Sequence, residues 1–293
     1  MLAGADLHRR TANVLLLAAA ALWPAVGLQA EPPATQPLPA SRPASREALE
    51  PPLTPVDPAV EKILDRLERK GNQIEDIQAQ IEYVKTDRVL EDKQKCTGIL
   101  LFKQDKPNPR FLIRFDKFEQ EGVVRDKKEW HAFDGQWYTE ARERTRTIVK
   151  RQIVRPGEQI EVFRLGQGPF PLPFGQKKGE IRGHFTVKLL PPAPGDPPNA
   201  DHLECTPIPG TDMARKYGTV HFYIDRSLDL PVRVCTIYKE EDTEVAASFR
   251  NIKVNGGLPG SATNVPDLPD YSIETVPLTS PAPEAGSARS GSG

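Results

Sequence analysis

The chain is poor in cysteine, in charge of one sign and in long apolar runs. Three cysteines among 293 residues are too few for a disulfide scaffold, so a stable fold must bury an apolar core. Lys and Arg total 39 and Asp and Glu total 40, giving a formal net charge of −1. This balance gives no general attraction to nucleic acid or to an acidic membrane surface, and we expect no nucleic-acid partner.

The motifs of common enzyme and metal sites are also missing. The histidines are scattered, at His8, His131, His184, His202 and His221. None has a metal-binding spacing such as HExxH, and we interpret His131 and His221 as hydrogen-bonded strand residues. No nucleophile elbow occurs, and the glycines at 166 and 168 do not open a helix pattern, which excludes a phosphate loop. We therefore expect no catalytic residue, no metal and no cofactor.

The N-terminus has the pattern of an export signal. Arg9 and Arg10 precede an apolar run over 12–23, and the small residues Gly27 and Ala30 follow. The run is too short to span a bilayer comfortably. We predict that 1–30 is a cleaved signal peptide and that the mature chain is exported, with an uncleaved N-terminal anchor as the alternative.

Two further stretches cannot supply a core. Residues 31–58 contain nine prolines mixed with Ala, Ser and Thr. We therefore predict that 31–57 is an extended linker. The tail over 277–293 is rich in Pro, Ser, Ala and Gly and is predicted to be disordered. A folded domain over 58–276 remains between them.

The clearest helix is predicted from Pro58 to about Lys70. Asp57 can cap it and Pro58 suits its first position, whereas Gly71-Asn72 is typical of a helix end. The apolar residues that recur at helical spacing on one face are Val60, Ile63, Leu64 and Leu67. This face must be buried.

Nearly all of the remaining domain has the pattern of strands. The expected strands are 76–86, 97–103, 110–117, 123–133, 136–141, 145–154, 181–190, 201–206, 217–224, 231–238 and 243–254, with 271–276 as an edge strand. Short turns such as Asp134-Gly135 favour an antiparallel meander. The predicted fold class is mainly β (α+β), with a curved antiparallel sheet that forms an unclosed barrel.

One short helix cannot cover so wide a sheet, since thirteen residues span only about 20 Å. The best additional cover is 162–174, where apolar residues alternate with Gly and Pro. Such a segment can turn inward but cannot form a regular element. It is predicted to be a lid over an apolar cavity, and a static plug is the alternative.

The cysteines leave an alternative open. Cys205 and Cys235 both lie in predicted strands and could pair in an oxidising compartment, which would leave Cys96 free.

Several motifs occur in the order found in a known family. They are Ile63–Leu67, the alternating Ile77–Tyr83, Thr97–Lys103 leading to Lys106-Pro107-Asn108, and Phe133–Tyr138 with its Asp-Gly turn. Over roughly 60–276 the chain resembles the periplasmic outer-membrane lipoprotein carrier proteins (LolA-type). That family shares an open barrel covered by helices with lipid-binding and envelope-sensing proteins.

The resemblance implies a monomeric periplasmic carrier without a cofactor. It would bind lipid or lipoprotein acyl chains, taking a lipoprotein from an inner-membrane release complex and passing it to an outer-membrane acceptor. In the family an Arg before the Pro-Asn turn is coupled to lid closure and transfer, and Lys106 stands at that place. Lys keeps the charge but loses the planar fork of hydrogen-bond donors.

The expected ligand-binding residues follow from the apolar sheet face, the helix and the lid. They are Leu64, Leu67, Ile81, Phe102, Phe111, Ile113, Phe115, Phe163, Leu165, Phe170, Leu172 and Phe174. The alternative function is an envelope sensor or partner-docking module that uses the same fold and transfers nothing.

Overall fold

The computed structural model describes residues 57–158 and 172–278. The chain divides into two units, Met1–Pro51 and Pro52–Gly293, and the described residues all belong to the second. The predicted signal peptide, nearly all of the predicted linker and tail, and most of the predicted lid therefore lie outside the described residues.

The described residues form mostly strands. The helical elements are α1 (Pro58–Gly71), α2 (Lys178–His184), α3 (Asp212–Lys216) and the short 3₁₀ helix η1 (Gly260–Thr263). The strands are β1 (Asp76–Asp87), β2 (Lys93–Lys103), β3 (Arg110–Gln120), β4 (Val123–Phe133), β5 (Trp137–Arg142), β6 (Thr147–Gln152), β7 (Phe185–Leu190), β8 (Ala200–Pro207), β9 (Tyr217–Asp225), β10 (Leu230–Tyr238), β11 (Thr243–Val254) and β12 (Ser272–Val276).

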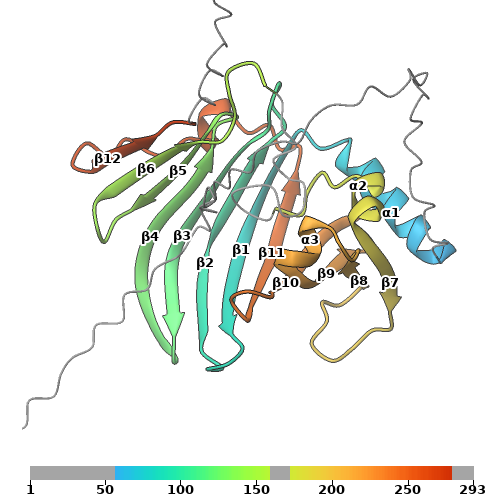
Figure 1. The fold of residues 1–293 in the computed structure, drawn as a ribbon. Helices are drawn as coiled ribbons and strands as arrows, with labels where there is room; N and C mark the ends of the chain where they lie inside the picture. Colours follow the sequence, from blue (N-terminus) through green and yellow to red (C-terminus); the bar gives the residue numbers. More distant parts are fainter. Residues whose placement is uncertain (1–56, 159–171, 279–293) are drawn as a thin grey trace, which may run out of the picture. The chain divides into compact units, whose positions relative to one another are not determined.

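All twelve strands belong to one unclosed sheet, in the order β12-β6-β5-β4-β3-β2-β1-β11-β10-β9-β8-β7 (Figure 1). Two antiparallel meanders, β1–β6 and β7–β11, are joined by pairing of β1 with β11. β12 is an edge strand, as predicted, but it pairs in parallel with β6. The predicted fold class is confirmed.

Helix α1 begins and ends where the sequence predicts. The Asp57 carboxylate accepts a hydrogen bond from the Ala59 N–H at 2.8 Å, and the Asn72 N–H closes the last turn on Glu68 and Lys70. Its apolar face, including Leu64 and Leu67, is buried against β7–β10. We call this set of side chains the helix cluster.

The sheet has two apolar faces, and alternation along each strand determines which residues lie on them. The inner face carries the helix cluster over β7–β10 and a second cluster over β1–β5 and β11. On the outer face, Leu112, Trp130 and Ile148 pack against Val265 and Leu268 from the segment before β12. The predicted inward orientation of Phe111, Ile113 and Phe115 is confirmed.

The predicted strand over 181–190 is wrong in its first half, which is helix α2. Ile181 is buried, while Lys178 and Arg182 form ion pairs with Glu61 of α1 at 2.5 and 3.0 Å. Helix α2 is held by contacts with α1, which is distant in sequence. Local propensity alone therefore did not predict it. Helix α3, which Thr211 caps through the Ala214 N–H, was also not predicted.

Cys205 and Cys235 do not pair, and all three cysteines are free thiols. Strand β9 lies between β8 and β10, which places these two positions roughly 10 Å apart, beyond the reach of a disulfide. Their partners in the β9 ladder, Val220 and His221, are neighbours in sequence, so the two thiols face opposite sides of the sheet.

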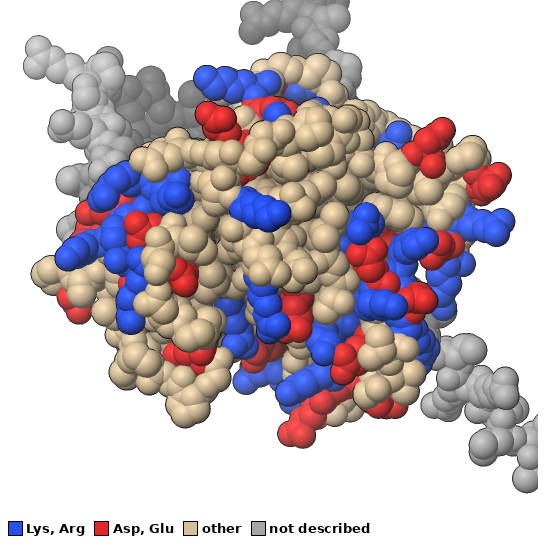
Figure 2. Space-filling model, turned by 180° about the vertical axis from the view of Figure 1, so that it is seen from behind, with Lys and Arg blue, Asp and Glu red and all other residues tan. Residues whose placement is uncertain are grey.

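The surface matches the balanced composition. Figure 2 shows Lys and Arg interspersed with Asp and Glu on one face, rather than a broad region of one sign. Within 57–158 and 172–278, none of the helices has the length and apolar character needed to cross a membrane.

Candidate functional site

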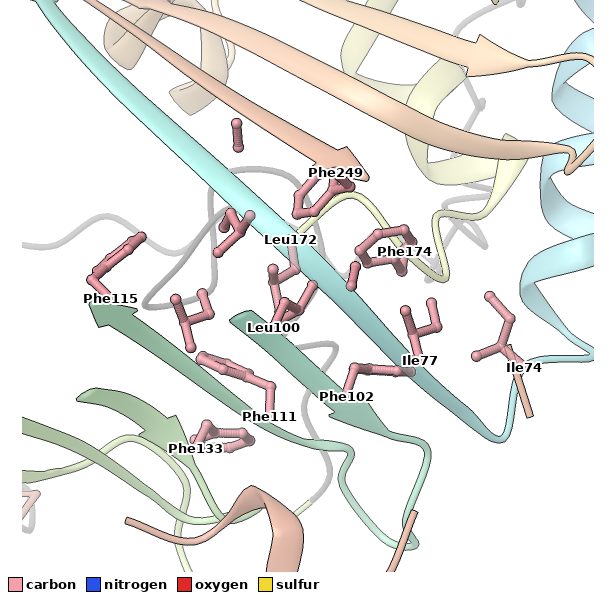
Figure 3. Close-up of a cluster of buried hydrophobic side chains, with 14 of the residues drawn as sticks. Ile74, Ile77, Leu100, Phe102, Phe111, Phe115, Phe133, Leu172, Phe174 and Phe249 are labelled. Carbon is pink, nitrogen blue, oxygen red and sulfur yellow. The ribbon is translucent and has the colours of Figure 1, made fainter. Parts of the chain in front are cut away.

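The candidate site is the second cluster on the inner face, which we call the inner cluster (Figure 3). Its side chains project from neighbouring strands toward one another, and most are nearly inaccessible to solvent. The aromatic rings that form its centre are Phe102, Phe111, Phe115, Phe133, Phe174 and Phe249. The cluster combines a strand-built floor with side chains from an irregular segment.

The structure brings together most of the described residues that the sequence assigns to ligand binding. Those in the inner cluster are Ile81, Phe102, Phe111, Ile113, Phe115, Leu172 and Phe174. Leu64 and Leu67 lie on the same face of the sheet but in the helix cluster, against β7–β10. Phe163, Leu165 and Phe170 lie outside the described residues, and Lys106 is in the turn between β2 and β3.

Residues 172–176 cover the inner cluster at β1 and β11. Leu172 and Phe174 are 2% and 0% exposed, and the Phe174 ring meets the Phe249 ring edge-on, with their centroids 5.0 Å apart. The Gln176 amide donates to the Leu172 carbonyl at 3.3 Å. An irregular segment, rather than a helix, thus covers this part of the sheet.

A buried polar group borders the inner cluster on β4 and β5. Glu129 and His131 alternate with Phe133 on the inner face, and Glu140 is directly opposite His131. His131 Nε2 is 3.3 Å from Glu129 Oε1, and His131 Nδ1 hydrogen-bonds the Tyr138 hydroxyl at 2.7 Å. We call Glu129, His131, Tyr138 and Glu140 the polar row.

Cations compensate the carboxylates of the polar row. Lys127 Nζ is 2.6 Å from Glu129 Oε2, and Arg142 contacts both Glu129 and Glu140. Burial alone would raise the pKa of Glu129, but the hydrogen bonds and charges of His131 and Lys127 outweigh it and hold that pKa at about 2. Burial, with the charges of Glu140 and Glu129, raises the pKa of the Tyr138 phenol.

The polar row contains residue types that bind metal ions, but its carboxylates are already paired with cationic side chains. Ligand atoms of Glu129, His131 and Glu140 lie within 4.8 Å of one another. Arg142 and Lys127 already supply the positive charge that an ion would bring. The row is therefore best described as a charge network at the margin of the apolar floor. In the sequence, this charge network was indicated by polar residues at inward-facing positions of the predicted strand 123–133.

Lys106 lies at a different place, beside an open hollow of about 370 Å³. The hollow is lined by the β2–β3 turn, the β4–β5 turn and 155–158, which directly precede the predicted lid. Asn108, only 5% exposed, donates to the carbonyls of Gly135 and Glu158 at 2.9 and 3.0 Å. The Lys106 turn is thereby tied to residue 158, a few positions before the predicted lid.

The second hollow, of about 570 Å³, lies at the opposite ends of these strands, near Leu90 and Gly122. Neither hollow is lined by a member of the inner cluster. The side chains of the inner cluster are themselves almost completely buried.

Comparison with known proteins gives similarity at the level of solved structures. No family model matches the chain, and no curated protein matches it. A putative outer membrane lipoprotein-sorting protein domain from Vibrio parahaemolyticus is 13% identical with a TM-score of 0.36, covering 70% of this chain and 97% of that one. A LolA superfamily protein from Nitrosomonas europaea is 10% identical with a TM-score of 0.31, covering 70% and 97%.

A third similar structure is the MucA/MucB complex of Pseudomonas aeruginosa. The identity is 13% and the TM-score 0.40, and the match covers 74% of this chain but 64% of the other. At such values the similarity decides nothing about ligand or partner. The similar solved structures thus include the lipoprotein-sorting and LolA proteins that the sequence motifs resemble.

Proposed function

We propose that this chain is a periplasmic carrier that binds lipid or lipoprotein acyl chains on its inner face, for transfer toward the outer membrane. The observation that carries the proposal is the cover of the inner cluster, where Leu172 and Phe174 come from an irregular segment rather than from a sheet or helix. Such a cover can leave without breaking any strand pairing. The acyl chains would then occupy the place of Leu172 and Phe174.

The energies favour this exchange. Exposing Leu172 and Phe174 costs about 3–6 kcal/mol, at about 1.5–3 kcal/mol for each side chain. Burying an acyl chain of about fourteen methylenes gains on the order of 11 kcal/mol, at about 0.8 kcal/mol for each methylene. The aromatic floor can therefore hold a lipid without specific polar contacts. The proposed role requires neither catalysis nor a cofactor.

The direct test is the lipid content of protein purified from its native envelope. Mass spectrometry of an organic extract should find acyl-bearing lipid in near-stoichiometric amount. Truncation by Phe174→Ala should speed the uptake of a fluorescent fatty acid, because less cover must be displaced. A protein that contains no lipid and takes up no fatty acid, although folded, would remove the carrier proposal.

Lys106 is proposed to act in handover, because its turn is tied through Asn108 to Glu158, a few positions before the predicted lid. Lys106→Ala should slow cargo uptake or release while leaving the melting temperature nearly unchanged. Lys93→Ala, at an exposed position in the β1–β2 region, is the matched control. A large drop in melting temperature for Lys106→Ala would make the residue structural instead.

The alternative, a sensor or docking module that transfers nothing, has its own supporting observation. Val89 and Leu90 are 71% and 76% exposed beside β1, and Val123 and Val124 are 51% and 59% exposed at the start of β4. Exposed aliphatic residues on two hairpins suit contact with a protein. Val89→Ser with Leu90→Ser should then abolish partner binding and leave lipid content unchanged. A carrier, in contrast, should release its lipid to an acceptor membrane, which a sensor would not do.

A further inference from the structure

Two histidines lie side by side on the outer face of the sheet, away from the inner cluster. His202 is on β8 and His221 on β9, and the ladder pairs His202 with Tyr223 and Glu204 with His221. The neighbours of His221 in sequence, Val220 and Phe222, belong to the helix cluster on the inner face. Alternation therefore places both imidazoles on the side of the sheet opposite α1.

The imidazole nitrogens have the separation of two ligands on one ion. His202 Nε2 and His221 Nδ1 are 3.0 Å apart. Two imidazole nitrogens bound at roughly 2.0–2.1 Å to one zinc ion, in adjacent positions, lie roughly 2.9–3.4 Å apart. The two rings now hydrogen-bond each other, so one of these nitrogens carries a proton. If that proton shifts to the other nitrogen of the same ring, small rotations would turn both lone pairs toward a shared ion.

The other nitrogen of His202 already has the partner that a metal ligand requires. Asp196 Oδ2 is 3.3 Å from His202 Nδ1, and the Ala193 N–H donates to the same oxygen at 2.9 Å. A carboxylate on the far nitrogen fixes the tautomer and orientation of a metal-bound histidine. Stacking on Tyr223, with ring centroids 4.2 Å apart, further restricts the His202 ring.

Three carboxylates and one guanidinium surround the pair, since Arg233 lies over the Tyr223 ring, 5.4 Å from its centroid. Asp196, Glu204 and Glu244 all lie close enough for their charge to act on His221. Burial, followed by the effect of His202, nevertheless lowers the pKa of His221, which favours the neutral imidazole that a metal ion requires. Among the described residues, Glu204 and Glu244 form no ion pair with Lys or Arg. The polar row differs in this respect, since Lys127 and Arg142 neutralise its carboxylates.

We propose that His202 and His221 together bind one divalent transition-metal ion of the zinc type, with Asp196 orienting His202. Zn²⁺ and Ni²⁺ suit a site built on two imidazoles, whereas Mg²⁺ and Ca²⁺ prefer oxygen ligands alone. The ion would bridge β8 and β9 on the face that α1 leaves uncovered. The site is independent of lipid binding.

The test is a calorimetric titration of the full chain, without a polyhistidine tag, with ZnCl₂. The wild-type protein should bind one ion and show a higher melting temperature in Zn²⁺ than in a chelator. Asp196→Asn should weaken binding by about 10–100-fold, as expected for an orienting carboxylate. His202→Gln and His221→Gln should each abolish both the binding and the thermal shift.

The control variants separate this site from other histidines. His184→Gln removes a partly exposed histidine of α2 and should bind Zn²⁺ like the wild type. Melting in a chelator checks that each variant is folded. Unchanged Zn²⁺ binding in His202→Gln and His221→Gln would overturn the proposal. Loss of binding in Glu140→Gln, with both histidine variants unaffected, would assign the ion to the polar row and would also overturn it.

Discussion

At the scale of single residues, Glu129 is a buried carboxylate on the inner face with several charged neighbours. It is 2% exposed and contacts Lys127, His131 and Arg142. A buried carboxylate is stable only when its charge is compensated, and here the compensation exceeds the burial penalty because its pKa falls to about 2. The charge of Glu129 therefore stabilises the folded state.

We expect Glu129→Gln to destabilise the protein in a pH-dependent way. The folded pKa of about 2 lies below the ordinary value of 4.5, so the stabilisation is fully present above pH 4.5 and is lost as the pH falls toward 2. The shift corresponds to about 3 kcal/mol at pH 7. Urea unfolding from pH 7 to pH 2.5 should show the wild-type and variant free energies of unfolding converging.

Glu119→Gln is the control for this comparison. Glu119 pairs with Lys95 at 2.5 Å, but both side chains are 34% exposed. Solvent screening should keep its effect below about 1 kcal/mol. Equal effects of the two substitutions at all pH values would contradict the assignment of Glu129 as a stabilising buried charge.

At the scale of elements, the pairing of β2 with β3 depends on one glycine. The register of the two strands shifts between Thr97 and Gly98. A Cβ at position 98 would overlap the carbonyl oxygen of Arg114 on the facing strand. The glycine thus permits a close backbone approach within a pair of strands that also presents Leu100 and Ile113 to the inner cluster.

Gly98→Ala should lower the free energy of unfolding by at least about 2 kcal/mol, because the two backbones must move apart. Gly179→Ala is the matched control, since a Cβ there meets no atom and alanine favours the helical conformation of α2. Chemical unfolding of both variants checks the prediction. A Gly98→Ala protein as stable as the wild type would show that the close approach of β2 and β3 at Gly98 is not required.

At the scale of the whole sheet, the inner face divides into two apolar clusters with different covers. α1 covers the helix cluster, whereas residues 172–176 cover the inner cluster. α1 is a regular helix with ion pairs to α2, so we expect it to stay in place. Residues 172–176 form an irregular apolar segment, which we expect a ligand to replace. Ligand exchange is therefore expected at the inner cluster alone.

This division predicts different effects for Leu64 and Phe174, both of which the sequence assigned to one cavity. Leu64→Ala should cost about 2–5 kcal/mol of stability and leave fatty-acid affinity unchanged. Phe174→Ala should change the rate of fatty-acid uptake at a similar loss of stability. Fluorescence titration and thermal melting of both variants distinguish the two clusters. Reduced fatty-acid affinity in Leu64→Ala would place the ligand under α1 instead.

Much of the fold was predictable from local pattern. The caps of α1, the alternation along β1 and β3, and the turn at Asp134-Gly135 all appear in the structure where the sequence places them. These features depend on residues within a few positions of one another, which is why periodicity and turn chemistry are sufficient. The apolar floor of the candidate site followed from the same alternation.

Tertiary structure alone decided which distant segments meet. The pairing of β1 with β11 joins residues more than 150 positions apart and produces one sheet from two meanders. The same ladder order separates Cys205 from Cys235 and brings His202 beside His221. It also places 172–176, rather than α1, over the aromatic floor. The sequence by itself determined most of the elements and their faces because those are local properties. The short helices α2 and α3 and the contacts between distant segments depend on packing that no short window of sequence contains.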